Sequence, residues 1–469
     1  MTAGRIFGID EAAHDELLQH VRALLRMPTV NPPGNEMVAA RYIHGVLTDA
    51  GLEPELLEPF PGRGDVVVRL RGDGSRGDPL LLLGHLDVVP VDASRWTHDP
   101  FGAEIHDGYV YGRGAVDMKA TVATQLEVVL LLARAAAAIG LDPASDPIPG
   151  LGRDVIFAAT ADEEAGGFLG AGWIVDQRPE LLRAGAALTE TGGFGVEVAG
   201  RRFYPIQAAE KGFQIYRITV HGSTGHASMP RSDNAAVLAS HVIERLVSPG
   251  SGRLTTVMHE ALRAVERAVP PEAARNVERL RSANPAVADA AAAALCDPAY
   301  ARALRALLRD TVSPDMVHAG VKYNVIPGSA EIEIDCRLLP GTTTESMTAQ
   351  LRERIGEDLW PACDVTPTLH GEPLEQTLDT PLYPLLGDAL RAADPDAIPI
   401  PMMAPFATDA KHLARLGIPT YGFAPLRLSA GERFLELFHG DDERVPLEGL
   451  RFGLDVLADA VLRYTAATD

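Results

Sequence analysis

The chain has 469 residues, of which 46% are hydrophobic, and a formal net charge of −22. This composition predicts a large core, arranged as two or three domains or as one large α/β domain. The acidic balance, without any basic block, argues against nucleic acid and membrane surfaces as partners.

The three cysteines, Cys296, Cys336 and Cys363, have no CxxC spacing, which favours a reducing compartment, and we expect a cytoplasmic protein. The first residues lack the basic start and apolar run of a signal peptide. The longest apolar stretch, VVLLLARAAAAIG, is too short to span a bilayer and contains Arg134. It is therefore predicted to be a buried helix.

The first part of the chain alternates helical patterns with apolar strands. Such alternation predicts a mixed, mostly parallel sheet covered by helices on both faces. The predicted helices cover residues 14–27, 37–52 and 121–138, and the predicted strands cover 65–70, 79–89 and 154–161.

The middle of the chain has the order β-α-β-β-α-β, which predicts a ferredoxin-like α+β domain with a helical insert at about residues 250–310. The α/β pattern returns after it, so the smaller domain interrupts the larger one. We expect a catalytic metal-binding domain at residues 1–204 and 371–469, and a lid or dimerisation domain at 205–370. The strands and helices predicted for the smaller domain cover 212–222, 234–247, 316–325, 329–339, 344–356 and 364–371.

The segment LLLLGHLDVVP places His85 and Asp87 two residues apart at a strand end, so both side chains are expected on one face. A metal-binding histidine commonly donates its other ring N–H to a carboxylate, and Asp87 is placed for that role. A surface turn is the alternative. Asp117, in YGRGAVDMKA, is either a helix N-cap or a carboxylate that bridges two metals.

Further acidic residues follow predicted strands: Glu163 and Glu164 in TADEEAGG, and Glu190 in LTETGG. Adjacent acids repel unless a cation neutralises them, so one would bind metal and the other would accept a proton. A solvated acidic turn is the alternative. His226, in HGSTGHASMP, and His439, in LFHGDDERVP, are structural or exposed if each is taken alone. Together these residues predict a pocket at the carboxyl ends of the strands, whose nitrogen and oxygen ligands suit zinc, cobalt or manganese.

Several segments follow one another in order over nearly the whole chain. They are GHLDVVP, GRGAVDMKA, TADEEAGG, LTETGG, GSTGHASMP, KYNVIPGSAEIEIDCRLLPG, ATDA and FHGDDERV. This series resembles the M20 metallopeptidase family of carboxypeptidase G2-like, succinyl-diaminopimelate desuccinylase-like and aminoacylase-like enzymes. The long insert is similar to that of the larger carboxypeptidase S-like and N-acyl-amino-acid hydrolase branch.

The resemblance implies two divalent metal ions, with zinc as the first choice and cobalt or manganese as alternatives. His85, Asp117 and Glu190 would hold one ion. Asp117, Glu164 and His439 would hold the other, so that Asp117 is shared.

The resemblance also implies that Glu163 is the general base and that Asp87 orients the metal-bound histidine. His226 would stabilise the oxyanion, often from the partner subunit of a dimer. Asn324 and Arg337 would recognise the substrate carboxylate or the tetrahedral intermediate, since an arginine fork pairs well with a carboxylate.

The implied function is hydrolysis, by metal-activated water, of an amide bond next to a free carboxylate in a small peptide or N-acyl amino acid. A homodimer through the lid domain is expected. A non-catalytic binding protein and a desuccinylase-type deacylase are the alternatives, whereas the lack of a GxSxG segment argues against a serine hydrolase. Thr191 and Ala407 replace family glycines, which leaves the loop after Glu190 and the pocket floor around Asp409 undefined.

Overall fold

The computed structural model describes residues 9–429 and 431–467 and divides into two compact units. The larger unit comprises the chain up to Ala208, Gln376–Met402 and the chain from Thr408 onward. The smaller unit comprises Ala209–Glu375 and Met403–Ala407. The chain of the larger unit is therefore interrupted by the smaller one.

The larger unit is built on a sheet with the strand order β1-β2-β6-β3-β7-β18-β9, and β8 and β17 also pair with β9. Strands β6, β3, β7 and β18 run parallel, whereas β1, β2 and β9 pair antiparallel with their neighbours. The prediction of a mixed, mostly parallel sheet is confirmed. The strands are β1 (Glu55–Phe60), β2 (Arg63–Leu70), β3 (Leu80–His85), β6 (Val155–Thr160), β7 (Ala186–Thr189), β8 (Val196–Val198), β9 (Arg201–Glu210), β17 (Ile398–Ala404) and β18 (Thr420–Gly422).

Helices cover both faces of this sheet. Leu81, Leu83 and Ile156 of alternate strand positions pack against Ile174 and Leu413 from helices on one face. Gly84 points to the other face, where a Cβ atom would lie 2.7 Å from Val122 of α4, so the close helix packing there requires glycine. The helices are α2 (Glu11–Leu25), α3 (Met37–Asp49), α4 (Lys119–Ala137), α5 (Ala171–Gln177), α12 (Leu382–Ala393), α13 (Ala410–Leu413) and α14 (Leu447–Thr465).

Helix α4 contains most of the apolar stretch at residues 128–140 that is predicted to be a buried helix, and it ends at Ala137. It is longer than that stretch and, by length and composition alone, could cross a membrane. However, 83% of its apolar window is buried within the structure, as in a core helix. Arg134, near its end, pairs with Glu16 and Glu127. The prediction of a buried helix is confirmed.

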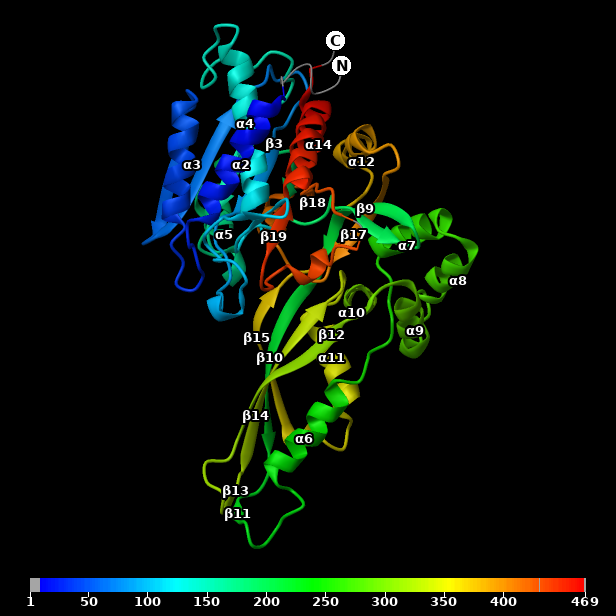
Figure 1. Ribbon diagram of the computed structural model, residues 1–469. Coiled ribbons are helices and arrows are strands. Elements are labelled where there is room, and N and C mark those ends of the chain that lie inside the picture. Colours follow the sequence, from blue (N-terminus) through cyan, green and yellow to red (C-terminus); the bar gives the residue numbers. More distant parts are fainter. Residues whose placement is uncertain (1–8, 430, 468–469) are drawn as a thin grey trace. The chain divides into compact units, whose positions relative to one another are not determined.

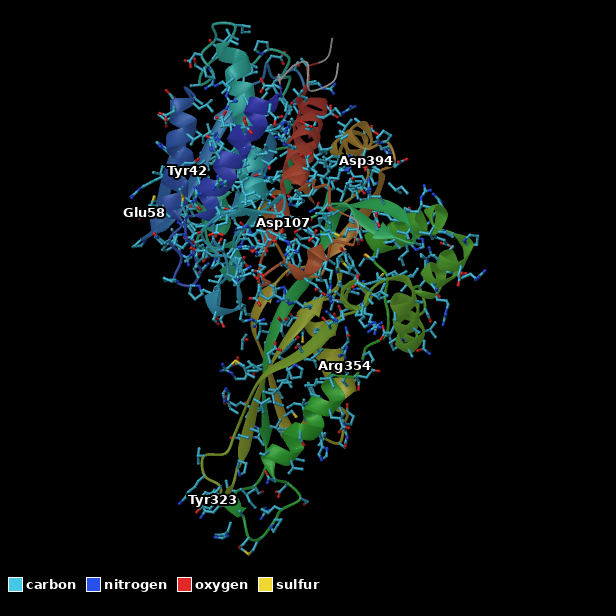
Figure 2. The ribbon with its side chains drawn as sticks, in the orientation of Figure 1. Tyr42, Glu58, Asp107, Tyr323, Arg354 and Asp394 are labelled. Atoms are coloured by element: carbon cyan, nitrogen blue, oxygen red, sulfur yellow. The ribbon has the colours of Figure 1, made fainter. Side chains whose placement is uncertain are left out.

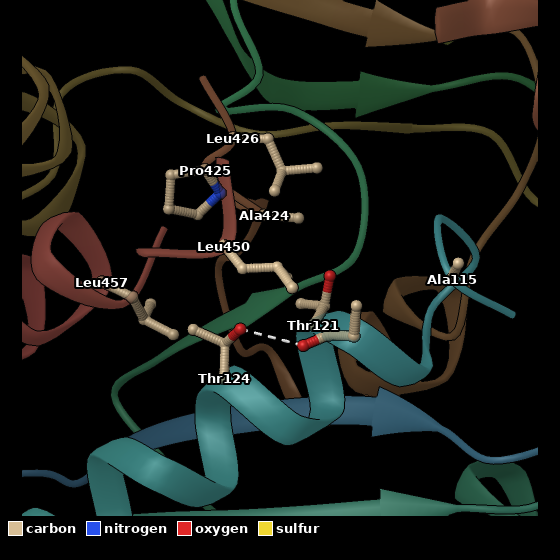
Figure 3. Close-up of a pocket in the computed structure, with 9 residues that line it drawn as sticks. Ala115, Thr121, Thr124, Ala424, Pro425, Leu426, Leu450 and Leu457 are labelled. Carbon is tan, nitrogen blue, oxygen red and sulfur yellow. Dashed lines mark hydrogen bonds between the residues drawn. The ribbon is translucent and has the colours of Figure 1, made fainter. Parts of the chain in front are cut away.

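A small cavity of about 10 Å³ remains where α4 meets α14 (Figure 3). Thr121 and Thr124 of α4 and Leu450 and Leu457 of α14 contribute to its lining. The space admits about one water molecule. It is a packing gap between two core helices, and its lining carries no charged side chain.

A separate three-stranded sheet joins distant parts of the larger unit. Its strands are β4 (Ile105–His106), β5 (Tyr109–Tyr111) and β19 (Arg444–Pro446), in the order β19-β5-β4. Because Arg444 pairs with Tyr111, the segment before β19 lies beside the turn that leads into α4. This pairing brings residues from near the chain's end to the start of a helix more than three hundred residues earlier.

The smaller unit has an antiparallel sheet with the order β12-β14-β10-β15, which is the ferredoxin-like arrangement (Figure 1). Helices α6 and α11 pack on it through an apolar cluster that includes Val242 and Leu351. The predicted ferredoxin-like fold is confirmed, with helices α7–α10 as its insert. The elements are β10 (Gly212–His221), β11 (Gly225–His226), α6 (Ala235–Leu246), α7 (Thr256–Ala268), α8 (Pro271–Arg279), α9 (Pro285–Leu295), α10 (Pro298–Leu307), β12 (Thr311–Ala319), β13 (Val325–Ile326), β14 (Ser329–Leu338), α11 (Thr344–Ile355), β15 (Cys363–Gly371) and β16 (Leu374–Glu375).

One predicted strand, residues 316–325, is wrong in its extent. β12 begins earlier, at Thr311, and ends at Ala319, and Gly320 then adopts a left-handed backbone with φ of 72°. The following residues form a loop before the short strand β13. Tyr323, labelled in Figure 2, is 93% exposed in this loop. The apolar residues that suggested a strand are therefore on the surface.

Candidate metal centre

Three neighbouring parallel strands of the larger unit end where the candidate ligands begin. β3 ends at His85, β6 ends three residues before Glu163, and β7 ends just before Glu190. Because β6, β3 and β7 are adjacent and parallel, their carboxyl ends lie at one edge of the sheet. This topology collects the side chains at that edge.

Asp117 lies between two histidines. Its Oδ1 is 3.0 Å from His85 Nε2, and its Oδ2 is 3.2 Å from His439 Nε2. His85 Nε2 is also 3.7 Å from Glu190, and His439 Nε2 is 3.1 Å from Glu164. Met118, not Asp117, is the N-cap of α4, so Asp117 is not a helix cap.

These contacts form two groups whose ligand atoms all lie within 4.8 Å of one another. The first is His85, Asp117 and Glu190, and the second is Asp117, Glu164 and His439. They are the two sets predicted from the sequence. Glu164 Oε1 is buried and has no hydrogen-bond partner among the described residues. An unpaired carboxylate oxygen in a cluster of nitrogen and oxygen donors fits a divalent cation.

The crowding of charges shifts the pKa values of these groups. Burial and the neighbouring Asp117 carboxylate raise the pKa of Glu190 to about 8. Hydrogen bonds to Asp117 and Glu164 raise the pKa of His439 to about 10. Burial opposes ionisation of Asp117, but hydrogen bonds from His439 and His85 hold its pKa well below its usual range. In the absence of a cation, protons on the neighbouring groups balance the carboxylate charge.

Asp87 connects His85 to the loop that carries both glutamates. Its Oδ1 is 3.4 Å from His85 Nδ1 and accepts a hydrogen bond from the backbone N–H of Glu163, at 3.1 Å. Its Oδ2 accepts from the backbone N–H of Glu164, at 3.1 Å, and from Asn31 Nδ2, at 2.8 Å. The backbone oxygen of Asp87 lies closer to His85 Nδ1, at 3.1 Å. Asp87 therefore orients the histidine through its backbone oxygen and its carboxylate, and the carboxylate also holds the Glu163–Glu164 backbone.

Glu163 itself lies in the turn that follows β6. Burial, strengthened by the nearby Glu190 carboxylate, raises the pKa of Glu163 well above its ordinary value. The same turn needs Gly167, whose φ is 71° and whose added Cβ would lie 2.0 Å from Asp409 Oδ1. This close approach explains the second glycine of the TADEEAGG segment.

The two replacements of family glycines have different outcomes. Thr191 has a φ of 66°, so it keeps a left-handed conformation that glycine adopts without strain. Ala407 has no such backbone, so no glycine-specific conformation is needed there. Asp409 is buried and accepts a hydrogen bond from Thr160 Oγ1 at 3.3 Å.

Glu443 was not identified from the sequence. It is fully buried, and its carboxylate accepts hydrogen bonds from the backbone N–H groups of Gly114, Val116 and Asp117 and from Arg113 Nη1. Arg113 in turn donates to the backbone oxygen of His439, at 3.2 Å. The short spacing between His439 and Glu443 in FHGDDERV is the only sequence signal for this role.

Two other groups of potential ligands occur among the described residues of the larger unit. In the first, the rings of His98 and His106 are stacked, 3.8 Å apart and nearly parallel, so one ion cannot lie in the plane of both rings. In the second, Glu16 and Glu127 already pair with Arg134. Neither group is arranged like the two ligand groups that share Asp117.

His226 and Asn324 lie close together in the smaller unit. His226 pairs with Val325 across β11 and β13, and the backbone N–H of Ala227 donates to Asn324 O. His226 Nδ1 accepts hydrogen bonds from the backbone N–H and the hydroxyl of Ser228, at 3.2 and 2.8 Å. Since a backbone N–H can only donate, the neutral ring carries its proton on Nε2, which is available as a donor.

Arg337 is on β14, where its guanidinium pairs with Asp335 at 2.9 Å. Its Nε and Nη2 both donate to this carboxylate, and its Cζ is 5.8 Å from the Phe213 ring centre. Two of the nitrogen donors of the Arg337 guanidinium are therefore already bonded to Asp335. Recognition of a substrate carboxylate by Arg337 would require its remaining donors or the displacement of Asp335.

Comparisons with known proteins agree with this architecture. Human aminoacylase-1 is 28% identical over 453 residues, which are 93% of this chain and 92% of that protein. The structure of the M20 family metallo-carboxypeptidase Sso-CP2 from Sulfolobus solfataricus matches with a TM-score of 0.69 and 17% identity, over 97% of this chain and 100% of the other. The Bacillus subtilis YXEP protein, a dinuclear metal-binding peptidase, matches with a TM-score of 0.59 and 15% identity, over 97% and 98%.

The chain is thus an enzyme, a hydrolase of the metallopeptidase class. The model of peptidase family M20/M25/M40 matches residues 81–463. Because this match covers most of the chain, the protein belongs to that family. The predicted family and enzyme class are confirmed.

Proposed function

We propose that this enzyme holds two divalent cations around Asp117 and hydrolyses an amide bond next to a free carboxylate. The observation that carries the proposal is the position of Asp117, each of whose oxygens faces a different histidine. A carboxylate with this arrangement is suited to bridge two ions. The similarity to aminoacylase-1 favours N-acyl amino acids and small peptides as substrates.

We propose zinc as the metal, with cobalt and manganese as alternatives. Each group offers one imidazole nitrogen and carboxylate oxygens, without sulfur, and zinc, cobalt and manganese all accept such ligands. Bound ions would polarise the substrate carbonyl and increase the acidity of water. They would also neutralise the carboxylates whose pKa values burial now raises.

Glu163 is the proposed general base. Its position in the turn after β6, beside the proposed ligand Glu164, suits a group that takes a proton from water and passes it to the leaving amine. Asp87 acts by position: it holds the His85 ring and the backbone of Glu163 and Glu164 in one geometry. Asp87 therefore does not need to touch the substrate.

The smaller unit supplies the remaining proposed groups. His226 would donate its Nε2–H to the oxyanion, because Ser228 occupies Nδ1. Asn324 has a buried Oδ1 without a partner among the described residues and would contact the substrate or the intermediate. Arg337 would bind the substrate carboxylate with its unoccupied donors.

A homodimer through the smaller unit is part of the proposal. The loops around His226 expose Met229, Val321 and Tyr323, of which the last two are 98% and 93% exposed. Exposed apolar side chains gathered around a proposed catalytic histidine suit an interface with a second copy of the chain.

All three cysteines are free, which supports the proposed cytoplasmic location.

The test is amine release from dipeptides, N-acetyl and N-succinyl amino acids by zinc- or cobalt-loaded protein. Glu163→Gln should bind two metals per chain and lose at least about a thousandfold in kcat. Glu180→Gln, an exposed residue, is the matched control. If Glu163→Gln retains turnover, Glu163 is not the base, and if no substrate with a free carboxylate is cleaved, the proposed substrate class is wrong. A strong preference for N-succinyl substrates would instead identify a desuccinylase.

A further inference from the structure

The smaller unit contains a cavity of about 260 Å³ where the helical insert meets the ferredoxin-like fold. Residues after α6, from α9 and α10, from the start of β12 and from the end of α11 line it. Four of the lining side chains are arginines, Arg302, Arg305, Arg309 and Arg354, the last of which is labelled in Figure 2. In a chain with a net charge of −22, this concentration of positive charge needs an explanation.

Only two carboxylates line the cavity, so two positive charges remain in excess. Asp289 pairs with Arg309, with 2.7 Å between its Oδ1 and Nη2. Asp310 accepts hydrogen bonds from the backbone N–H of Leu339, at 2.7 Å, and from Gln350 Nε2, at 2.8 Å. Four arginines against two aspartates leave a net charge of +2 around the space.

Several guanidinium N–H groups have no acceptor. Arg305 Nε, Arg309 Nε and Arg354 Nη2 are buried and make no hydrogen bond among the described residues, although Arg305 Nε lies 3.8 Å from Asp289 Oδ1. Arg309 as a whole is only 5% exposed. Buried donors without acceptors are unfavourable, and charged ones more so. The two lining aspartates therefore do not fully match the four arginines.

The arginines are held in position by other contacts. Arg354 Nη1 donates to the backbone oxygen of Leu246 at the end of α6, at 3.1 Å, and Arg305 Nη2 donates to the backbone oxygen of Asp289, at 3.2 Å. Gly250 permits the backbone to approach, since an added Cβ would lie 2.5 Å from Arg354 Nη2. Capping of a helix end explains one N–H of Arg354 but not its second nitrogen or the open space beside it.

We propose that this cavity binds a small oxyanion with two negative charges, such as phosphate or a short dicarboxylate. Planar guanidinium groups pair with such oxygens through parallel hydrogen bonds, and the charge of the anion matches the excess of two. The site would give the helical insert a binding role separate from the metal centre of the larger unit.

The experiment is calorimetric titration of inorganic phosphate, and separately of succinate, into the full-length metal-loaded protein in chloride buffer. Arg305→Gln and the exposed Arg302→Gln should each weaken binding by about tenfold. Arg263→Gln, on α7 and outside the cavity, should leave it unchanged. Metal-dependent activity of each variant shows that it is folded.

Phosphate can also bind to metal ions, so a variant of the metal centre, Asp117→Asn, distinguishes binding at the metals from binding in the arginine cavity. Anion binding that persists in Asp117→Asn but weakens in Arg305→Gln and Arg302→Gln supports the cavity, and the tighter anion identifies the ligand chemistry. Binding that is unchanged in both arginine variants and lost in Asp117→Asn would overturn the proposal. Absence of binding by both anions would overturn it as well.

Discussion

Glu443 accepts a hydrogen bond from the backbone N–H of Asp117, with 3.1 Å between Oε1 and N. The same carboxylate accepts from Gly114 and Val116, so it organises the whole turn that presents Asp117. Burial raises the pKa of Glu443, while Arg113 opposes the shift. The position of the proposed bridging ligand thus depends on a residue that makes no contact with the proposed metals.

Replacement of this carboxylate should loosen the metal centre. Glu443→Gln has one acceptor oxygen instead of two and leaves Arg113 buried without its ionic partner. We expect metal affinity or activity to fall by about 10- to 100-fold. Mass spectrometry gives the metal content of Glu443→Gln, and steady-state kinetics give its kcat. The exposed Glu448→Gln is the control. Unchanged metal content and kcat would show that the turn is held without Glu443.

The strained residue beside Glu190 should limit stability. Thr191 has a β-branched side chain in a left-handed backbone, which costs about 1–2 kcal/mol relative to glycine. Thr191→Gly should raise the thermal unfolding temperature by about one degree, because the higher backbone entropy of glycine offsets part of the gain and a chain of this size has a large unfolding entropy. Scanning calorimetry of the metal-loaded protein checks this. A lower melting temperature would mean that the threonine side chain compensates for its own strain.

Metal binding should release protons near neutral pH. The pKa of His439 is about 10 and that of Glu190 is about 8 in the metal-free protein, yet both must be deprotonated to bind a cation. Apparent metal affinity should therefore rise with pH up to about 10. Titration calorimetry in buffers of different ionisation enthalpy measures the number of protons. Equal observed enthalpies in all buffers would contradict these pKa values.

A buried lysine should give the smaller unit a distinct pH dependence. Burial lowers the pKa of Lys211 to about 7 from its ordinary value of 10.5, although its amine donates to the backbone oxygens of Ala306 and Arg309. Between these two pH values the unfolded chain binds a proton that the folded chain does not. The contribution of Lys211 to stability therefore rises with pH across this window and is lowest below pH 7.

The comparison of wild type with Lys211→Met isolates this effect. The difference in their free energies of unfolding should change by up to about 1.4 kcal/mol per pH unit above pH 7, in favour of the wild type. Urea unfolding followed by circular dichroism measures it, and the exposed Lys322→Met is the control. Parallel curves for wild type and Lys211→Met would show that Lys211 stays charged in the folded protein.

Local sequence patterns predicted the fold class, and together with the family resemblance they predicted the members of the candidate site other than Glu443. Apolar runs with helical or strand spacing depend on neighbours a few residues away, so α4, β3 and the elements of the ferredoxin-like fold could be predicted from them. His85, Glu163 and Glu190 were found because each follows an apolar strand. The strand predicted at 316–325 was displaced, because β12 begins at Thr311 and ends at Ala319, just before Gly320.

The resemblance implied the two ligand sets, but only the tertiary structure gives the physical reason that their members meet. The pairing of β19 with β5 brings His439 to Asp117 and places Glu443 under the turn, although more than three hundred residues separate them. The pairing of Arg337 with Asp335 also could not be predicted from residue spacing, because it depends on side-chain conformation. The arginine cavity could not be predicted either, because four separate segments enclose it. Residue spacing determines local periodicity, but long-range pairing and the balance of buried charge depend on how the elements pack.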